Sequence, residues 1–232
     1  MPVLRVLSYN VRSLRDDSYA VARVIRGCRP HVVCLQEAPR LLGWRGSRRR
    51  LARRAGLTAA VSRRPGGLAV LVRPEVAVVH REHHVLRRLS GLPVRAIAVA
   101  VLEAHGRRLA VGCTHLDLDA GARLRHAREA LDVLERVATE WGARPVLAGD
   151  LNEGPDGPAW RLLATRLADP GAQAGRAAAG TFSARRPRRR IDAVLTAPEL
   201  TVRRAGVPVE LLAAEDVVAA SDHRPVLAEL EL

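Results

Sequence analysis

The chain has 232 residues, a mass of 25.2 kDa and a hydrophobic content of 48%. A chain of this length buries a core large enough to fold without disulfides or a structural metal, so we expect a single domain. The net charge of +14, carried by arginine alone, favours a polyanionic partner such as nucleic acid, a phosphorylated metabolite or an anionic membrane face. Because abundant arginine and alanine also indicate a GC-biased genome, the clustering of charge is more informative than its total.

Three cysteines, Cys28, Cys34 and Cys113, lie in or beside apolar runs and form no CxxC pair. We expect them to be reduced core residues and not catalytic thiols. Arg5 interrupts the apolar run that a signal peptide would need, and no run approaches the roughly 18 apolar residues of a membrane span. These features predict a cytoplasmic protein without a membrane span.

The beginning of the chain has the succession strand, helix, strand. Residues 3–8 alternate as a strand does, residues 16–18 offer helix N-caps, and Gly27 ends the helix. Residues 31–35 form a second apolar strand. A succession of this length predicts a parallel βαβ unit, in which both strands end at the same edge of a sheet.

The remaining segments alternate between strand and helix patterns. The turns at 64–66, 73–75 and 104–106 favour antiparallel hairpins between short strands. Paired strands followed by helices in both halves of the chain predict an α/β sandwich of two packed sheets with outer helices. The predicted helices span 40–55, 119–141 and 158–168, a loop spans 169–181, and the predicted strands span 58–62, 67–72, 76–80, 94–102, 107–114, 146–152, 191–195, 201–207 and 225–230.

Six segments place polar side chains next to apolar strands. Each has a plain structural interpretation, such as a helix cap for Asp150, a turn for Asn152 or an ion pair with Arg190 for Asp192. Together they predict one polar cluster, because the strand ends meet at a common edge. The segments carry Asn10, Glu37, His115, Asp150 with Asn152, Asp192, and Asp222 with His223.

Carboxylates that converge without partners repel one another, so a bound cation is the natural way to keep them ionised. Oxygen ligands without cysteine favour a hard cation, Mg²⁺ or Mn²⁺. Histidines add groups that change protonation near neutral pH. Metal, carboxylate and histidine are the groups that phosphoester hydrolysis requires.

The motifs, in chain order, resemble those of the endonuclease/exonuclease/phosphatase superfamily, which includes deoxyribonuclease-like and exonuclease III-like enzymes, neutral sphingomyelinases and inositol polyphosphate 5-phosphatases. The resemblance covers the chain from about residue 3 to its C-terminus. It implies one catalytic domain over residues 1–232 with a four-layer α/β/β/α sandwich of two mixed sheets. The motifs are Ser8-Tyr9-Asn10-Val11, Leu35-Gln36-Glu37, Thr114-His115, Gly149-Asp150-Leu151-Asn152, Arg190-Ile191-Asp192 and Ser221-Asp222-His223-Arg224-Pro225.

The resemblance also implies roles for the polar residues. Glu37 would be the main Mg²⁺ ligand, with Asn10 in the same metal environment and Asp222 as a ligand or neighbour. Asp150 would orient and activate the attacking water, and Asn152 would bind phosphoryl oxygens. His223, supported by Asp192, would contact the scissile phosphate or act as base, while His115 would stabilise or protonate the leaving side.

The substrate is the open question at this level, since a fold and its motifs do not fix it. Five arginines lead directly into Asp192 and favour a nuclease-like enzyme acting on nucleic acid; the alternative is that they lie on a solvated loop. We expect the protein to be a monomer. A phosphatase or phosphodiesterase for a small soluble ester or lipid headgroup is the second hypothesis, and an inactive binding module the third. The arginines are Arg185, Arg186, Arg188, Arg189 and Arg190.

Overall fold

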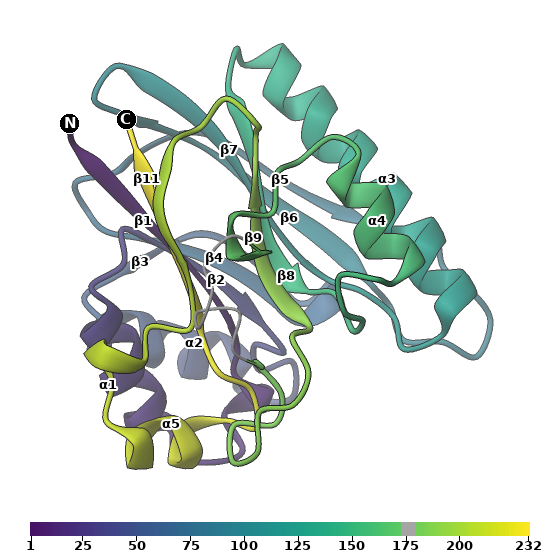
Figure 1. Cartoon of the computed structure of the whole chain (residues 1–232). Helices are drawn as coiled ribbons and strands as arrows, with labels where there is room; N and C mark the ends of the chain where they lie inside the picture. The colour runs from purple at the N-terminus through teal and green to yellow at the C-terminus, as the bar shows by residue number, and fades with distance from the viewer. Residues whose placement is uncertain (173–179) are drawn as a thin grey trace.

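Two mixed β-sheets pack face to face in the computed structural model, which describes residues 1–172 and 180–232. Helices α1 (Ser18–Cys28), α2 (Trp44–Arg54) and α5 (Ala214–Ala220) lie together on one side of the molecule, and α3 (Ala120–Glu140) and α4 (Pro158–Ala164) lie on the other (Figure 1). The order helix, sheet, sheet, helix confirms the predicted four-layer sandwich.

The first sheet has six strands in the order β10-β11-β1-β2-β4-β3. Strands β1 and β2 are parallel and are joined through α1, which confirms the predicted βαβ unit. The other neighbours in this sheet are antiparallel. The strands are β1 (Val3–Asn10), β2 (Val32–Gln36), β3 (Thr58–Arg63), β4 (Leu68–Val72), β10 (Val202–Gly206) and β11 (Val226–Glu231).

The second sheet has five strands in the order β5-β6-β7-β8-β9. Strands β7 and β8 are parallel, connected by the long helix α3, and the other neighbours are antiparallel. In both sheets a parallel pair therefore lies next to antiparallel partners. The strands are β5 (Ala77–Val85), β6 (Ala96–Ala104), β7 (Arg107–His115), β8 (Arg144–Asp150) and β9 (Asp192–Thr196).

Side chains that alternate along each strand build three apolar layers. On β8, Val146 and Ala148 face the layer between the sheets, and Leu147 faces the helices α3 and α4. On β1, Val6 faces the inner layer and Leu7 faces α1 and α5. This period of two is what a strand buried on both faces requires. All three cysteines are buried and unpaired, as predicted.

Most predicted elements are confirmed, and the differences have local causes. The hairpin predicted at 73–75 is wrong, because β4 and β5 belong to different sheets. The helix predicted over 40–55 begins only at Trp44, since Gly43 has a left-handed φ of +75° at the N-cap. The helix α5 was not predicted. Of the loop predicted over 169–181, residues 173–179 lie outside the described part of the chain.

Arg48 on α2 is buried without a carboxylate partner in the described residues and anchors the loop that follows β2. Its guanidinium donates to the carbonyl oxygens of Leu68 at 2.8 Å and of Pro39 and Arg63 at 2.9 Å. Burial, with a contribution from Arg40, lowers the pKa of Arg48 to about 10. The planar fork with five donors suits this set of acceptors.

Replacing Arg48 with methionine is expected to lower the free energy of unfolding by about 3 kcal/mol, because several buried carbonyl groups lose their donor. Urea unfolding followed by circular dichroism measures this loss. Arg49→Met, on the exposed next position of the same helix, is the matched control and should cost less than about 0.5 kcal/mol. Equal losses in the two variants would contradict the anchoring role.

Candidate active site

The inward-facing rows of side chains become polar where the strands end, and these ends form the candidate site. Asp150 continues the inward row of Val146 and Ala148 on β8, and Asp192 precedes Val194 in the inward row of β9. The strand register places Asp150 between His115 of β7 and Asp192 of β9. All three side chains are buried. The site is therefore the polar end of the layer between the sheets.

Asn10, at the end of β1, links the two sheets at this position. Its amide nitrogen donates to Asp150 Oδ2 at 3.0 Å and to Glu37 Oε1 at 3.2 Å. Its amide oxygen accepts the Arg12 N–H at 3.0 Å, so the nitrogen must face the carboxylates. Asn10 thus presents a donor to the two acids, which makes it a positioning group for them.

Asn152 reaches the site by a route different from the predicted one. The strand was expected to stay extended through Asn152, but β8 ends at Asp150 and Asn152 has a left-handed φ of +55°. Asp150 Oδ1 accepts the Asn152 N–H at 3.0 Å, which stabilises this turn. The Asn152 amide nitrogen then lies 3.1 Å from His115 Nε2 and 3.0 Å from the Leu116 carbonyl oxygen.

His223 and Asp192 form a buried pair. Nδ1 of His223 lies 2.9 Å from Asp192 Oδ2, and Nε2 lies 3.7 Å from Asp150 Oδ2. The Ser221 hydroxyl donates to the Asn10 carbonyl at 2.8 Å and accepts the His223 N–H at 3.2 Å, which fixes the segment against β1. The ring of Phe182 packs against the imidazole at 5.0 Å between centroids. One ring nitrogen is therefore oriented by Asp192 while the other faces Asp150.

The two histidines have opposite electrostatic surroundings. Burial lowers the pKa of His115 to about 4, and the nearby Arg95 adds to this effect. Burial also opposes the charge on His223, but the facing carboxylates of Asp192 and Asp150 raise its pKa to about 9. Burial and the neighbouring Asp192 raise the pKa of Asp150. A neutral and a charged imidazole thus flank one carboxylate.

The four acidic residues of the predicted site lie at different distances from its centre. Ligand atoms of Asp150, Asp192 and His223 all lie within 4.8 Å of one another. Glu37 joins this cluster through Asn10, and it has a left-handed φ of +48°. Asp222 does not join it: its carboxylate lies 3.4 Å from Arg12 Nε on a partly exposed flank. Asp222 therefore lies outside the group of Asp150, Asp192 and His223, and its role as a metal ligand stays a prediction.

The arginine segment before Asp192 divides into two parts. Arg190 forms an ion pair with Asp169 at 2.6 Å, and its guanidinium stacks on the Trp160 ring at 4.6 Å. Its side chain is therefore engaged within the protein. The segment is joined to the site because Phe182 bridges both Arg189 and His223. The side chains of Arg185, Arg186, Arg188 and Arg189 are exposed.

Two supporting groups were not predicted from the sequence. The Thr181 hydroxyl accepts the N–H of Ile191 at 3.0 Å and of Asp192 at 3.2 Å, which fixes the start of β9. Arg95 forms a buried ion pair with Asp117 at 3.2 Å. Asp117 follows His115 by two residues, so its place just after the same apolar strand was a signal for it in the sequence. Nothing local in the sequence marks Thr181.

Comparisons with known proteins agree with this geometry. The family model described as the Endonuclease/Exonuclease/phosphatase family matches residues 7–223. Among curated protein sequences, none matches the chain significantly. Several solved structures share the fold.

A mannosyl-6-phosphatase of Bacteroides thetaiotaomicron has a TM-score of 0.83 at 19% identity, with 99% of this chain and 100% of that chain covered. An endonuclease/exonuclease/phosphatase of Bacteroides vulgatus has a TM-score of 0.78 at 22% identity and full coverage of both chains, 100% each. The human Nocturnin catalytic domain, solved with a bound sulfate anion, has a TM-score of 0.75 at 17% identity, covering 99% and 93%. With the family model matching most of its length, the chain belongs to the endonuclease/exonuclease/phosphatase family.

Proposed function

We propose that this protein is a phosphoesterase that requires a bound Mg²⁺ or Mn²⁺ ion and hydrolyses phosphodiester bonds, with nucleic acid as the substrate. The observation that carries this proposal is the buried group of Asp150, Asp192 and His223, with Glu37 beside it. Two carboxylates side by side at the end of a sheet are costly unless a cation or a donor offsets their charge.

The donor set of the site fits a hard divalent cation. The carboxylates of Glu37 and Asp150 share the Asn10 amide as a donor and so lie on the same side of the site. We assign these two acids as the principal ligands, because Asp192 is engaged with His223 and Mg²⁺ prefers oxygen ligands. When bound, the cation supplies charge neutralisation at the substrate phosphate and lowers the pKa of a coordinated water.

The remaining residues bind and orient the reacting groups. Asp150 orients the attacking water and accepts its proton, a role supported by its buried place between His115 and Asp192. His223, held by Asp192, donates to a phosphoryl oxygen through Nε2 and stabilises the developing charge. Asn152 binds a second oxygen when one of its two amide N–H groups leaves its present acceptor, either His115 Nε2 or the Leu116 carbonyl oxygen. His115 is neutral, and its Nε2 accepts from Asn152, so we assign it the orientation of that amide and not proton transfer to the leaving group.

The arginine segment supports nucleic acid as the substrate. Four exposed guanidinium groups lie on a segment that contacts His223 through Phe182, so a strand bound at the site would pass along them. Arginine binds phosphate through parallel hydrogen bonds, and a basic track beside a metal site holds a polyanionic backbone. The net charge of the whole chain, +14, is also opposite in sign to that of a phosphate backbone.

The second candidate is hydrolysis of a small soluble phosphate ester. The mannosyl-6-phosphatase of Bacteroides thetaiotaomicron shares the fold over 99% of this chain and, by its name, acts on a sugar phosphate. Since one fold serves different substrates, this likeness makes the small-ester reaction a specific alternative. Parallel assays with single-stranded DNA, RNA, plasmid, inositol phosphates and bis-p-nitrophenyl phosphate discriminate between the two.

Replacing Glu37 with glutamine or Asp150 with asparagine is expected to reduce kcat/KM with any accepted phosphoester by about 10³-fold or more, because each removes charge from the site. Steady-state hydrolysis in Mg²⁺ and in Mn²⁺ measures the loss. Asp132→Asn, on the exposed face of α3, carries the same charge change away from the site and should retain full activity. An active Glu37→Gln enzyme would refute the proposed ligand.

Metal binding is expected to stabilise the wild-type protein and not these two variants. An ion present at 100 times its dissociation constant adds about 2.7 kcal/mol to the free energy of unfolding, because it binds only the folded chain. Thermal unfolding in EDTA and in increasing Mn²⁺ measures the shift without turnover. A wild-type melting temperature that is the same in EDTA and in Mn²⁺ would contradict the assignment of a cation to Glu37 and Asp150.

The exposed arginine segment is expected to set the salt dependence of DNA binding. Changing Arg185, Arg186, Arg188 and Arg189 to glutamine should make the slope of log K against log salt shallower by at most about 3 for single-stranded DNA. Fluorescence anisotropy with a labelled oligonucleotide in Ca²⁺ or EDTA measures this slope. Arg190 is left intact because it pairs with Asp169. An unchanged slope would assign the four arginines to a solvated loop.

A further inference from the structure

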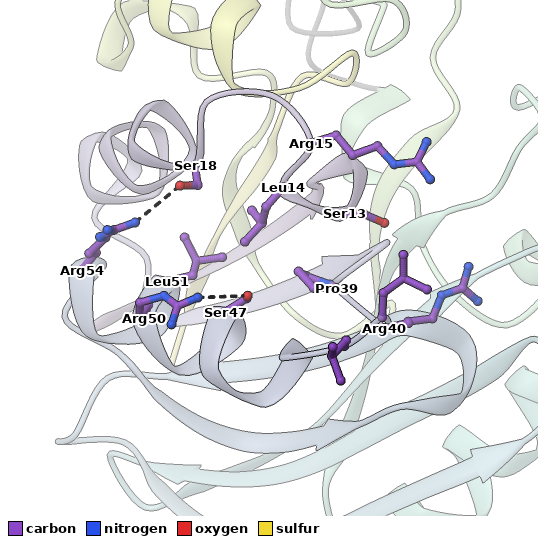
Figure 2. A pocket seen from close by; sticks show the side chains of 12 residues that line it. Ser13, Leu14, Arg15, Ser18, Pro39, Arg40, Ser47, Arg50, Leu51 and Arg54 are labelled. Atoms are coloured by element: carbon purple, nitrogen blue, oxygen red, sulfur yellow. Dashed lines mark hydrogen bonds between the residues drawn. The ribbon is translucent and has the colours of Figure 1, made fainter.

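A pocket of about 370 Å³ lies next to the segment that carries Glu37, and Figure 2 shows the side chains that line it. Three segments form its walls: the connection between β1 and α1, the loop after β2, and one face of α2. The side chains that could bind a polar ligand are four arginines and three serines, while four leucines and Pro39 contribute apolar surface. The arginines are Arg15, Arg40, Arg50 and Arg54, and the serines are Ser13, Ser18 and Ser47.

The pocket shares a wall with the site of the proposed metal ligands. The Ser13 N–H donates to the Glu37 carbonyl oxygen at 2.8 Å, and Arg12, next to it, donates to Asn10 Oδ1 at 3.0 Å. Ser13 and Leu14 hold left-handed φ values of +57° and +55°, which few non-glycine residues adopt. A ligand in the pocket is therefore adjacent to the residues that surround Glu37.

The charge of the pocket is uncompensated in the part of the chain that the structure describes. None of its four arginines takes part in a salt bridge there, and no acidic side chain lines the pocket. Of the nearest acids along the chain, Asp16 pairs with Arg12, Asp17 pairs with Arg23, and Glu37 accepts a hydrogen bond from Asn10. Similar charges gathered in one concave site attract an anion.

Two of the arginines are held toward the pocket by weak contacts that leave most of their donors free. Arg50 Nη2 lies 3.3 Å from Ser47 Oγ, and Arg54 Nη1 lies 3.4 Å from Ser18 Oγ (Figure 2). The Arg54 guanidinium also stacks on the Tyr19 ring at 3.8 Å. Each guanidinium has five N–H donors, so at least two per arginine remain for a ligand. Phosphate, with its several acceptor oxygens, suits this arrangement.

We propose that this pocket binds a second phosphate group of the substrate, distinct from the phosphate that is hydrolysed. The inference rests on the proposed phosphoesterase function for its substrate, but the binding itself does not require turnover. The ligand class is a phosphoester that carries at least one further phosphate, either as the next unit of a nucleic-acid strand or on a small bisphosphorylated molecule.

A purely structural role explains only part of the arrangement. Basic residues in the last turn of a helix complement its dipole, and Arg53 and Arg54 both lie in the last turn of α2. Arg50 lies outside that turn. Residues 47, 50, 51 and 54 follow the spacing of one helix face, and this face lines the pocket, whereas Arg49 and Arg53 do not line it. The two arginine pairs of α2 therefore offer a matched comparison.

The test measures ligand binding by calorimetry to the Asp150→Asn protein, in which turnover is expected to be suppressed. The probes are p-nitrophenyl phosphate, inositol 1,4-bisphosphate and a 5′-phosphorylated tetrathymidylate. Added to this background, Arg50→Gln with Arg54→Gln should weaken binding of a multiply phosphorylated probe by about tenfold or more, because two charge-assisted contacts are lost. The singly phosphorylated probe should be unaffected.

Arg49→Gln with Arg53→Gln is the control, since it makes the same charge change on the same helix. A loss with inositol 1,4-bisphosphate alone identifies a small ester as the source of the second phosphate, and a loss with the oligonucleotide alone identifies a strand. Equal weakening by the two arginine pairs, or no weakening by either, would overturn the proposal. Melting temperatures of both variants verify folding. If the wild type hydrolyses no phosphoester, the proposed function fails while the binding result still stands.

Discussion

The hydrogen bonds from the Asn10 amide to Asp150 and Glu37 join the two sheets where their shared inner layer changes from apolar to polar. Asp150 and Asp192 are buried neighbours across the β8–β9 ladder, and removal from water raises the pKa of Asp150. The Asn10 amide, the Asn152 N–H and the His223 ring supply the donors that offset this cost. An apolar sandwich can therefore end in a charged site without unfolding at its edge.

Backbone strain is concentrated around the same groups. Glu37 and Asn152 both adopt left-handed φ values, and each lies within two residues of the end of a strand, where the chain turns across the site. Such conformations cost about 1 kcal/mol or more and persist when the surroundings hold them. Here the Ser13 N–H holds the Glu37 carbonyl, and Asp150 holds the Asn152 N–H. These conformations place the Glu37 carboxylate next to Asn10 and the Asn152 amide next to His115, where an extended strand would not have brought them.

Local sequence patterns were sufficient to predict those parts of the fold that depend on the alternation of side chains along a strand and on the succession of strands and helices. The βαβ unit of β1, α1 and β2 and the inward alternation that leads to Asp150 could both be read from the residues. What failed was long-range: the 73–75 turn passes from one sheet to the other, and no local signal distinguishes that from a hairpin. Asn152 had two interpretations in the sequence, a turn residue and a member of the polar cluster. Both apply, because the turn is what brings its amide to His115.

The same limit applies to the charges. In the sequence alone, the five arginines before Asp192 are equivalent. In the structure, Arg190 pairs with Asp169, which lies earlier in the chain, while the other four arginines are exposed. On α2, the run of arginines separates into Arg48 in the interior, one pair in the pocket and one pair outside it. Position in the fold, and not composition, thus decides which guanidinium groups are available to phosphate. Because exposed arginines lie on the His223 side of the site and pocket arginines on the Glu37 side, a substrate with negative charge on both sides of its scissile phosphate matches the field of this protein best.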